Sequence, residues 1–275
     1  MKWGIIGTGN MGQVLTHAFV QSQLLNQNDL HITNRTIDKA LQLRETYPNI
    51  HVEESVESLI DAVDTIFVCV KPNQMIPLFN EIKHIVTDQQ LVVSITSALS
   101  VEEIESLVNC NVARMIPSIT NQSLAGVSLV TFSDRVDITR KELFLKRCKS
   151  FSEPVEIEEN IVRIASDIVS CGPAFFAYLA QKFIHAASES TEITQEKATI
   201  LMEKMFEGFG TLLADKHFSL EELIDKVCVT GGITGVGISS LEKNGDDLFT
   251  HLIRETHHKF DEEKKNIAKE INHFT

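Results

Sequence analysis

The sequence predicts an α/β domain built on a doubly wound sheet, followed by an all-helical domain. Through residues 1–159, short apolar runs alternate with amphipathic helical patterns, as a parallel sheet with crossover helices requires. From residue 160 to residue 275 the alternation stops and helical patterns dominate. We place the boundary near Glu159, where a short acidic stretch precedes the first long helical pattern. With 275 residues, the chain can form two domains that each bury a core.

The predicted strands of the first domain are short and rich in apolar residues. The run 65–70 is almost wholly apolar, which is typical of a central strand buried on both faces, and Pro72 ends it. The other predicted strands are the run that ends at Gly7 and the runs at 31–35, 52, 91–95, 112–115, 127–132 and 155–157. Helices are predicted directly after Gly7 and over 36–43, 56–62, 75–85, 100–108 and 139–150.

The second half reads as helices over 161–190, 194–215, 220–228 and 248–275. Capping boxes, in which a Ser and a Glu three residues later exchange hydrogen bonds, are predicted at Ser100 and Ser219. A glycine-rich break, 230–237, separates the third and fourth of these helices. Four glycines in this break indicate that its backbone closely approaches something, although a plain helix connector is the simpler alternative.

The first twelve residues contain a dinucleotide-binding fingerprint. Gly7-x-Gly9-x-x-Gly12 follows an apolar run and opens a helical pattern, which is the context that this motif requires. Gly7 permits the tight turn, Gly9 lets the backbone approach a pyrophosphate, and Gly12 lets the helix pack against the strand. The phosphates would bind the free N–H groups at the helix N-terminus. The pattern therefore favours a Rossmann-type site over a glycine-rich turn without a ligand.

The end of the second predicted strand indicates which dinucleotide binds. NAD sites usually carry an acidic residue there, but this chain has Asn34, Arg35 and Thr36. A guanidinium and a hydroxyl can both donate to a 2′-phosphate, and Arg does so with two hydrogen bonds. We therefore expect NADPH as the cofactor and weaker binding of NADH. An exposed Arg at a helix start is the alternative interpretation.

Composition argues against several classes of partner. The net charge of −13 disfavours nucleic acid and anionic membranes, and no apolar run approaches the ~20 residues of a membrane span. Five scattered cysteines without a C-x-x-C pair indicate a reducing cytoplasm and no disulfide framework. We expect no signal peptide. The adjacent His257 and His258 lie in no metal-binding motif, so no metal site is predicted.

Several motifs, in order over nearly the whole chain, resemble the pyrroline-5-carboxylate reductase family. They are Gly7-Thr-Gly-Asn-Met-Gly12, Asn34-Arg35, Val70-Lys71-Pro72, Arg114-Met-Ile-Pro117, Cys171-Gly-Pro-Ala-Phe175 and Gly231-Gly-Ile-Thr234. The stretches 116–121, 124–131 and 166–175 look like the late-competence-operon branch of that family. The resemblance implies reduction of 1-pyrroline-5-carboxylate to L-proline with NAD(P)H, as in proline biosynthesis. It also implies a small-molecule substrate and a helical domain that forms an intertwined homodimer or higher homo-oligomer, in which the partner completes each active site.

The same resemblance implies roles for individual residues. The pyrophosphate would bind Gly7, Thr8, Gly9, Asn10, Met11 and Gly12, and the adenosine end would bind Asn34, Arg35 and Thr36. Val70, Lys71 and Pro72 would border the ribose and the nicotinamide. Gly231, Gly232, Ile233 and Thr234 would form the substrate loop, with N–H groups on the carboxylate. The Thr234 hydroxyl would lie near the imine nitrogen, as the catalytic group of an otherwise sparse site.

The chain departs from the family pattern at three places. Ser118 stands where the family has an amide, Cys171 where it has Ser, and Val229-Thr230 where it has Ser-Pro before the substrate loop. A hydroxyl donor to the carboxylate is thereby lost, which costs about 1.5–3 kcal/mol. Small-residue packing explains Cys171 better than a nucleophilic role, because no base is indicated nearby.

Lys71 and Arg114 each have two interpretations. Lys71 follows a buried strand at the edge where ligands bind, although a solvated lysine is the simpler alternative. For Arg114, bracing of the loop and ligand binding have equal weight.

Three functional hypotheses follow from these patterns. The first is an NADPH-dependent reductase of a cyclic imine. The second is a non-catalytic NADPH-binding regulatory protein of the late-competence type, descended from that enzyme. The third is a 2-hydroxyacid dehydrogenase, and its substrate and catalytic-lysine motifs are missing from the helical half.

Overall fold

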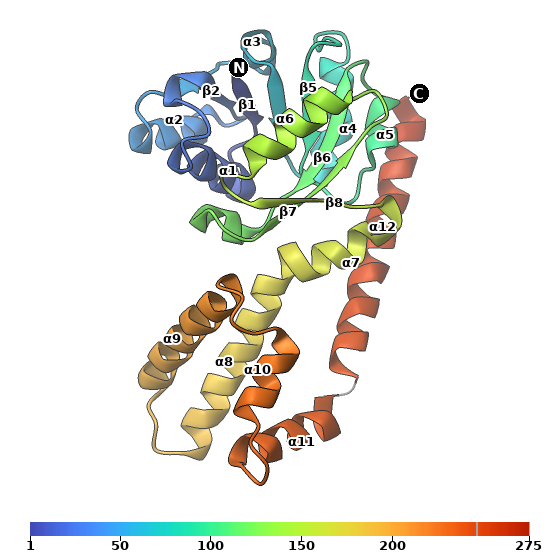
Figure 1. Cartoon of the computed structure of the whole chain (residues 1–275). Helices are drawn as coiled ribbons and strands as arrows, with labels where there is room; N and C mark the ends of the chain where they lie inside the picture. Colours follow the sequence, from blue (N-terminus) through green and yellow to red (C-terminus); the bar gives the residue numbers. More distant parts are fainter. Residues whose placement is uncertain (246, 275) are drawn as a thin grey trace. The chain divides into compact units, whose positions relative to one another are not determined.

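The computed structural model describes residues 1–245 and 247–274 (Figure 1). The chain divides into two compact units. The first comprises Met1–Gly172 together with Thr256–Thr275, and the second is Pro173–Glu255.

The first unit is built on an eight-stranded sheet in the order β3-β2-β1-β4-β5-β6-β7-β8. The strands are β1 (Trp3–Ile6), β2 (Leu30–Thr33), β3 (His51–Val52), β4 (Thr65–Val68), β5 (Leu91–Ser94), β6 (Asn111–Ile116), β7 (Val127–Phe132) and β8 (Glu153–Glu156). Every pairing is parallel except that of β6 with β7. Strands β1, β2, β4, β5 and β6 are buried along their whole length, as expected for a sheet covered on both faces. The predicted α/β fold class is confirmed.

The helices of this unit cover the two faces of the sheet (Figure 1). They are α1 (Asn10–Gln21), α2 (Ile37–Thr46), α3 (Val56–Ala62), α4 (Pro72–Ile82), α5 (Val101–Glu105), α6 (Ile138–Cys148) and α7 (Val162–Ser166). One core cluster joins α1, α2 and α6 around Trp3, whose ring lies 4.9 Å from Phe19 and 5.0 Å from Phe67. A second cluster joins α3, α4 and α5. Each helix pattern of the first half therefore corresponds to a crossover helix or a cap on this sheet.

Both predicted capping boxes are present, whereas Thr36 does not cap α2. The capping box at Ser100 is present, since its N–H donates to Glu103 Oε2 (2.7 Å) and its hydroxyl accepts from the Glu103 N–H (3.2 Å). The second box, at Ser219, is present as well. Thr36 precedes α2 but its side chain makes no capping bond. The carbonyl of Thr36 instead accepts from Asn34 Nδ2 at 2.9 Å, so the Asn34 amide organises this helix start.

The last helix, α12 (Leu248–Phe274), returns to the α/β unit over its C-terminal part. Ile267 is 5% exposed within the second core cluster, and Phe260 packs against the same cluster. The Thr256 hydroxyl donates to the buried Asp167 carboxylate at 2.7 Å. Asp167 is in turn paired with Arg163 at 2.7 Å. The end of the chain is therefore part of the first unit's core.

A π-helical turn, Asp167–Cys171, connects α7 with α8 (Gly172–Ser190). The resulting helical run, Glu159–Ser190, is long and apolar enough to cross a membrane by length and composition, and 22% of its most apolar window is buried. The run meets this criterion by its average hydropathy and not as a continuous apolar stretch, so the expectation about apolar runs stays a prediction. Polar residues divide the run in the sequence, so that it does not read as one continuous apolar segment.

The second unit contains α8, α9 (Gln195–Ala214), α10 (Leu220–Val227), α11 (Ile233–Gly245) and the first residues of α12. Helix α11 was not predicted, because its glycines each disfavour a helix by about 1 kcal/mol. Among the described residues of this unit, the buried apolar side chains are those of Ala180, Ile184 and Ala198. Many larger apolar side chains of the unit are exposed, including Phe183 (68%) and Ile233 (92%). Its helices therefore present apolar surface that their own packing does not cover.

Candidate functional site

The turn between β1 and α1 has the shape of a phosphate-binding turn. Gly7 has φ +101°, and a Cβ atom there would lie 2.6 Å from the Cys69 carbonyl oxygen. A Cβ on Gly12 would lie 2.0 Å from the Gly7 carbonyl oxygen. A Cβ on Gly9 would meet no atom within 4 Å. Gly7 and Gly12 are thus required by the fold, whereas Gly9 borders open space in front of the turn.

The start of α1 is free to bind an anion. Gly9 is its N-cap residue, no side chain caps the helix, and its first turn contains no acidic residue. The buried Thr8 hydroxyl has no hydrogen-bond partner among the described residues. Free N–H groups at a helix N-terminus and an unpaired buried hydroxyl are the donors that a pyrophosphate needs. The residues of this turn therefore fit the phosphates of a dinucleotide; Asn10 and Met11 are the first residues of α1 behind it.

Asn34 connects this turn to the end of β2. The Thr8 N–H donates to Asn34 Oδ1 at 3.0 Å, and the Gly7 N–H donates to the Thr33 carbonyl at 2.9 Å. The neighbouring Arg35 and Thr36 are exposed, and Arg35 forms no salt bridge within the described part of the chain. An unpaired guanidinium lies directly after β2, where NAD sites usually carry a carboxylate.

Val70, Lys71 and Pro72 follow the carboxyl end of β4, which pairs in parallel with β1. Contact between the two strand ends is direct, since the Cys69 N–H donates to the Ile6 carbonyl at 2.8 Å. Lys71 is exposed at the N-cap of α4, and Pro72 is the first residue of that helix. The strand order reverses between β1 and β4, and open α/β sheets bind their ligands outside such a reversal. The structure therefore brings Gly7, Asn34 and Lys71 to the same sheet edge.

Arg114 is fully buried and has a bracing role. Its guanidinium meets both carboxylate oxygens of Glu159, at 3.3 Å and 2.5 Å, and donates to Thr131 Oγ1 at 3.2 Å and to the Leu99 carbonyl at 3.4 Å. These contacts tie β6 and β7 to the start of the helical run. Of the two roles that the sequence left open, the structure supports the bracing one, because little of the guanidinium remains for a ligand.

The candidate substrate loop lies in the second unit and is shorter than expected. Gly231 has φ +74°, and the Gly232 N–H donates to the Val229 carbonyl at 2.9 Å. Helix α11 then begins at Ile233, so Ile233 and Thr234 belong to its first turn and not to a loop. A hollow of about 640 Å³ lies beside this start, lined in part by Val229, Thr230, Gly231 and Gly232. The free N–H groups of the first turn of α11 suit a carboxylate.

The described residues hold no metal-ligand cluster, and two of the buried cysteines are unreactive. In residues 1–245 and 247–274, no three His, Cys, Asp or Glu side chains are grouped so that they could hold a metal ion. Burial raises the pKa of the Cys110 thiol to about 12, and burial also raises the pKa of the Cys148 thiol. Because the thiolate is the reactive form, neither of these two residues is a nucleophile at neutral pH.

Two family profiles match the chain. Residues 159–263 match the pyrroline-5-carboxylate reductase dimerisation family, and residues 2–98 match the family described as NADP oxidoreductase coenzyme F420-dependent. ComE operon protein 4 of Bacillus subtilis is 43% identical over 272 residues, which cover 99% of this chain and 100% of that protein. Pyrroline-5-carboxylate reductase 3 of the same organism is 27% identical over 97% of this chain and 98% of its own. The chain belongs to the pyrroline-5-carboxylate reductase family.

Solved structures of pyrroline-5-carboxylate reductases share this fold. The Coxiella burnetii protein superimposes with a TM-score of 0.85 at 22% identity, covering 95% of this chain and 98% of that one. The Plasmodium falciparum pyrroline carboxylate reductase, solved with NADP bound, superimposes with a TM-score of 0.81 at 23% identity, covering 97% and 98% of the two chains.

Two departures from the reductase pattern lie at the π-helical turn: Ser118 contacts it, and Cys171 is its last residue. The Ser118 hydroxyl donates to the Val169 carbonyl at 2.8 Å, and Ser170 Oγ donates to the Pro117 carbonyl at 2.7 Å. Cys171 Sγ lies 3.5 Å from Arg163 Nη2, whose main partner is Asp167. Ser118 therefore fastens the turn to the end of β6, and Cys171 is a neighbour of an occupied guanidinium.

Sequence reasoning did not single out two polar residues, Ser97 and Arg163, whose side chains meet near the carboxyl end of β5. Ser97 follows the carboxyl end of β5, and its hydroxyl lies 3.4 Å from Arg163 Nη1. The position of Ser97 after a predicted central strand is the signal that could have identified it. Arg163 carried no such signal, because its partners are distant in the sequence or belong to an irregular turn.

Proposed function

We propose that this protein is an NADPH-dependent reductase of a cyclic imine, and that it converts 1-pyrroline-5-carboxylate to L-proline. The observation that carries the proposal is a pair of helix starts behind glycine turns, each without an acidic residue in its first turn. One is at Gly9 before α1, and the other is at Gly232 before α11. The first suits the phosphates of a dinucleotide, and the second suits the carboxylate of a small substrate. Membership in the reductase family supports this pairing.

In this proposal the residues at the sheet edge hold the cofactor. Gly7, Thr8, Gly9, Asn10, Met11 and Gly12 bind the pyrophosphate through N–H groups and the Thr8 hydroxyl. Arg35 and Thr36 donate to the 2′-phosphate, and Asn34 positions both elements through its amide. Val70, Lys71 and Pro72 border the ribose and the nicotinamide. When bound, the nicotinamide supplies the hydride, so the protein needs no nucleophile of its own.

The substrate residues act by orientation in this proposal. The N–H groups of Gly231, Gly232 and Ile233 bind the carboxylate, and the exposed Thr234 hydroxyl donates to or accepts from the imine nitrogen. Val229 and Thr230 replace a hydroxyl donor and a stiffening proline, so substrate binding is weakened and not abolished.

We propose a homodimer whose interface is formed by the helices after Glu159. Apolar side chains are exposed on several of these helices, and the second unit has few buried residues among those described. We propose that residues 1–159 form the NADP-binding domain. Residues 160–275 would form the domain that binds the substrate and makes the dimer. Light scattering at micromolar concentration tests the assembly. A monomer would contradict it.

A second function, that of a non-catalytic NADPH-binding regulator, is favoured by two observations. The protein is 43% identical to ComE operon protein 4, and its substrate loop carries the Val229-Thr230 change. In that case the sheet edge that carries Gly7, Asn34 and Lys71 (the cofactor edge) still binds NADPH. The helical unit would serve to recognise a partner.

The deciding experiment measures both binding and turnover. Purified protein is titrated with NADPH by nicotinamide fluorescence, and NADPH oxidation is then followed with pyrroline-5-carboxylate and a panel of cyclic imines. Turnover of pyrroline-5-carboxylate supports the reductase. Tight NADPH binding without turnover of any imine supports the regulator, and failure to bind NADPH contradicts both.

A further inference from the structure

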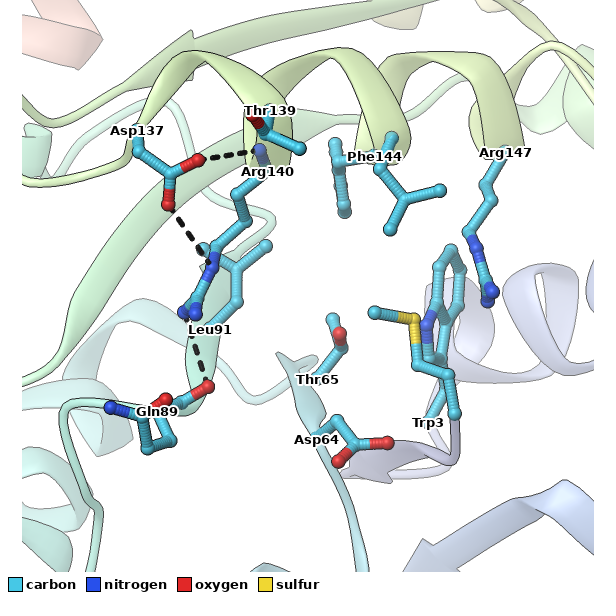
Figure 2. Close-up of a pocket in the computed structure, with 12 residues that line it drawn as sticks. Trp3, Asp64, Thr65, Gln89, Leu91, Asp137, Thr139, Arg140, Phe144 and Arg147 are labelled. Atoms are coloured by element: carbon cyan, nitrogen blue, oxygen red, sulfur yellow. Dashed lines mark hydrogen bonds and ion pairs between the residues drawn. The ribbon is translucent and has the colours of Figure 1, made fainter.

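A hollow of about 540 Å³ lies at the edge of the sheet opposite the fingerprint turn, beneath α6 (Figure 2). Trp3, Thr65 and Leu91 line it, and each is the first residue of its strand, β1, β4 and β5 respectively. Gly7 and Cys69 follow the carboxyl ends of β1 and β4. The length of a four-residue strand, about 13 Å, therefore separates this hollow from the cofactor edge.

The walls of the hollow are apolar, with a cation on each side. Phe144 and Leu143 of α6 complete an apolar surface with Trp3, whose ring stacks 6.1 Å from that of Phe144. Figure 2 shows Arg147 beside Trp3 on one side, and Arg140 with Asp137 and Gln89 on the other.

The two arginines differ in whether their charge is already satisfied. Arg140 donates to the Gln89 carbonyl at 3.1 Å and lies 3.9 Å from the Asp137 carboxylate. Arg147 is half-buried, and within the described residues its guanidinium has neither a carboxylate within 4 Å nor a hydrogen-bond acceptor. The nearby acids are occupied, since Asp137 also caps α6 and Asp64 accepts the Lys2 N–H at 2.7 Å. The unpaired charge that faces the hollow is therefore positive.

The indole N–H of Trp3 is a second donor without an acceptor. Trp3 is 0% exposed, and its Nε1 atom has no hydrogen-bond partner among the described residues. Buried donors in folded proteins are nearly always paired. Figure 2 shows the indole nitrogen on the edge of the ring that faces the middle of the hollow. An acceptor from outside the chain would satisfy it once the side chains that cover the indole edge move aside.

We propose that this hollow is a binding site for a small carboxylate with an apolar body, separate from the cofactor and substrate sites. The carboxylate pairs with the Arg147 guanidinium and accepts from the Trp3 indole N–H. The apolar body packs on the side chains of Leu143, Phe144 and Trp3. A cation is disfavoured, because both carboxylates of the hollow already have partners.

Trp3 is the single tryptophan of the chain, so intrinsic fluorescence reports directly on this site. The probe is phenylacetate, compared with the uncharged phenylacetamide and the cationic phenethylamine. Excitation at the red edge of the tryptophan band excludes absorption by the probes. We expect a saturable change with phenylacetate, with a dissociation constant of about 1 mM for so small a ligand. Phenylacetamide and phenethylamine should bind at least ten-fold more weakly.

Variants on α6 provide the matched comparison. Arg147→Gln should weaken phenylacetate binding ten-fold or more, whereas Lys146→Gln, the same charge change at an exposed neighbour, should leave it unchanged. Leu143 is 40% exposed, so Leu143→Glu should preserve the fold while its carboxylate enters the hollow and prevents binding. Thermal unfolding confirms that each variant is folded. Calorimetry replaces fluorescence if the tryptophan signal is small.

Four results would overturn the proposal. The first two are a fluorescence change that rises linearly with phenylacetate without saturation, and equal binding of phenylacetate and phenylacetamide. The other two are unchanged phenylacetate binding by both Arg147→Gln and Leu143→Glu, and competition between phenylacetate and NADPH. The last result would assign the carboxylate to the cofactor edge. None of these measurements depends on turnover, so the outcome is independent of the proposed reductase activity.

Discussion

Helix α1 approaches the turn after β1 so closely that a Cβ atom on Gly12 would lie 2.0 Å from the carbonyl oxygen of Gly7. Gly9, between them, has an ordinary φ of −73° and open space where its Cβ would be. The same motif thus contains glycines required by packing and a glycine required, in our proposal, by a ligand. The two kinds can be separated by experiment.

We expect Gly9→Ala to fold normally and to bind NADPH at least ten-fold more weakly, because the new methyl group enters the space proposed for the pyrophosphate. Gly12→Ala should instead destabilise the protein by about 1–3 kcal/mol or more, since backbone atoms must move. Thermal unfolding and NADPH fluorescence titration distinguish the two effects. Normal NADPH affinity in Gly9→Ala would place the pyrophosphate elsewhere.

Arg35 should determine the choice of cofactor. NADPH should bind at least ten-fold more tightly than NADH, a difference of about 1.4 kcal/mol, and Arg35→Asp should remove or reverse it. Arg44→Asp makes the same charge change at an exposed position of α2 and serves as the control. Equal titration curves for both cofactors in the wild-type protein would refute this role.

Glu159→Gln should destabilise the α/β unit by about 2–3 kcal/mol, because the buried Arg114 guanidinium would lose its charged partner. Glu158→Gln, at the exposed preceding residue, should have little effect. Urea unfolding measures both. Similar unfolding midpoints for the two variants would show that the pair contributes little to stability.

The buried His31 should make stability depend on pH. Burial lowers its pKa from the ordinary value of 6.5, despite the hydrogen bond to Glu53 at 2.8 Å, and the stacked His51 adds to the effect. The unfolded chain therefore binds a proton at higher pH than the folded chain. This stabilisation is complete above about pH 6.5 and is lost as the pH falls below that value. The midpoint of thermal unfolding should decrease on acidification, and His31→Gln should make this decrease smaller. An equal decrease in the variant and the wild-type protein would assign the pH dependence to other groups.

The substrate loop separates binding from chemistry. If the Val229-Thr230 change only weakens carboxylate binding, the double variant Val229→Ser with Thr230→Pro should lower KM about ten-fold at nearly constant kcat. Thr234→Ala should lower kcat, because its hydroxyl would meet the nitrogen whose charge changes. Steady-state kinetics with pyrroline-5-carboxylate measure both effects. A double variant that binds NADPH but turns over no substrate would favour the regulatory role.

Much of the α/β fold could be predicted because its strands and helices carry local signals. Val56–Ala62 and Val127–Phe132 have the predicted bounds, since apolar periodicity and flanking turn residues agree there. The antiparallel pairing of β6 with β7 was not expected. Only ten residues separate these strands, which is too few for a crossover helix, so this pairing could have been inferred from the spacing.

The remaining differences come from contacts that local sequence does not encode. Helix α11 forms despite its glycines, which individually disfavour it. The role of Arg114 depends on Glu159, 45 residues away. The unpaired state of Trp3 and Arg147 is a property of packing around the hollow, and no periodicity in the sequence indicates it. At the cofactor edge, by contrast, the strand ends were predictable, and with them the location of the candidate residues.

The return of α12 makes the second unit an insertion within the first. Residues 173–255 leave the α/β unit after Gly172 and rejoin it at Thr256, where the remaining helix supplies Ile267 to its core. A fragment that ends at Gly172 would therefore expose part of that core. During synthesis, the second cluster lacks Ile267 until α12 has left the ribosome, so the α/β unit completes its folding after the helices that interrupt it. Shortening α12 from its C-terminal end would consequently destabilise the α/β unit before the second unit, although the helix begins in the second unit.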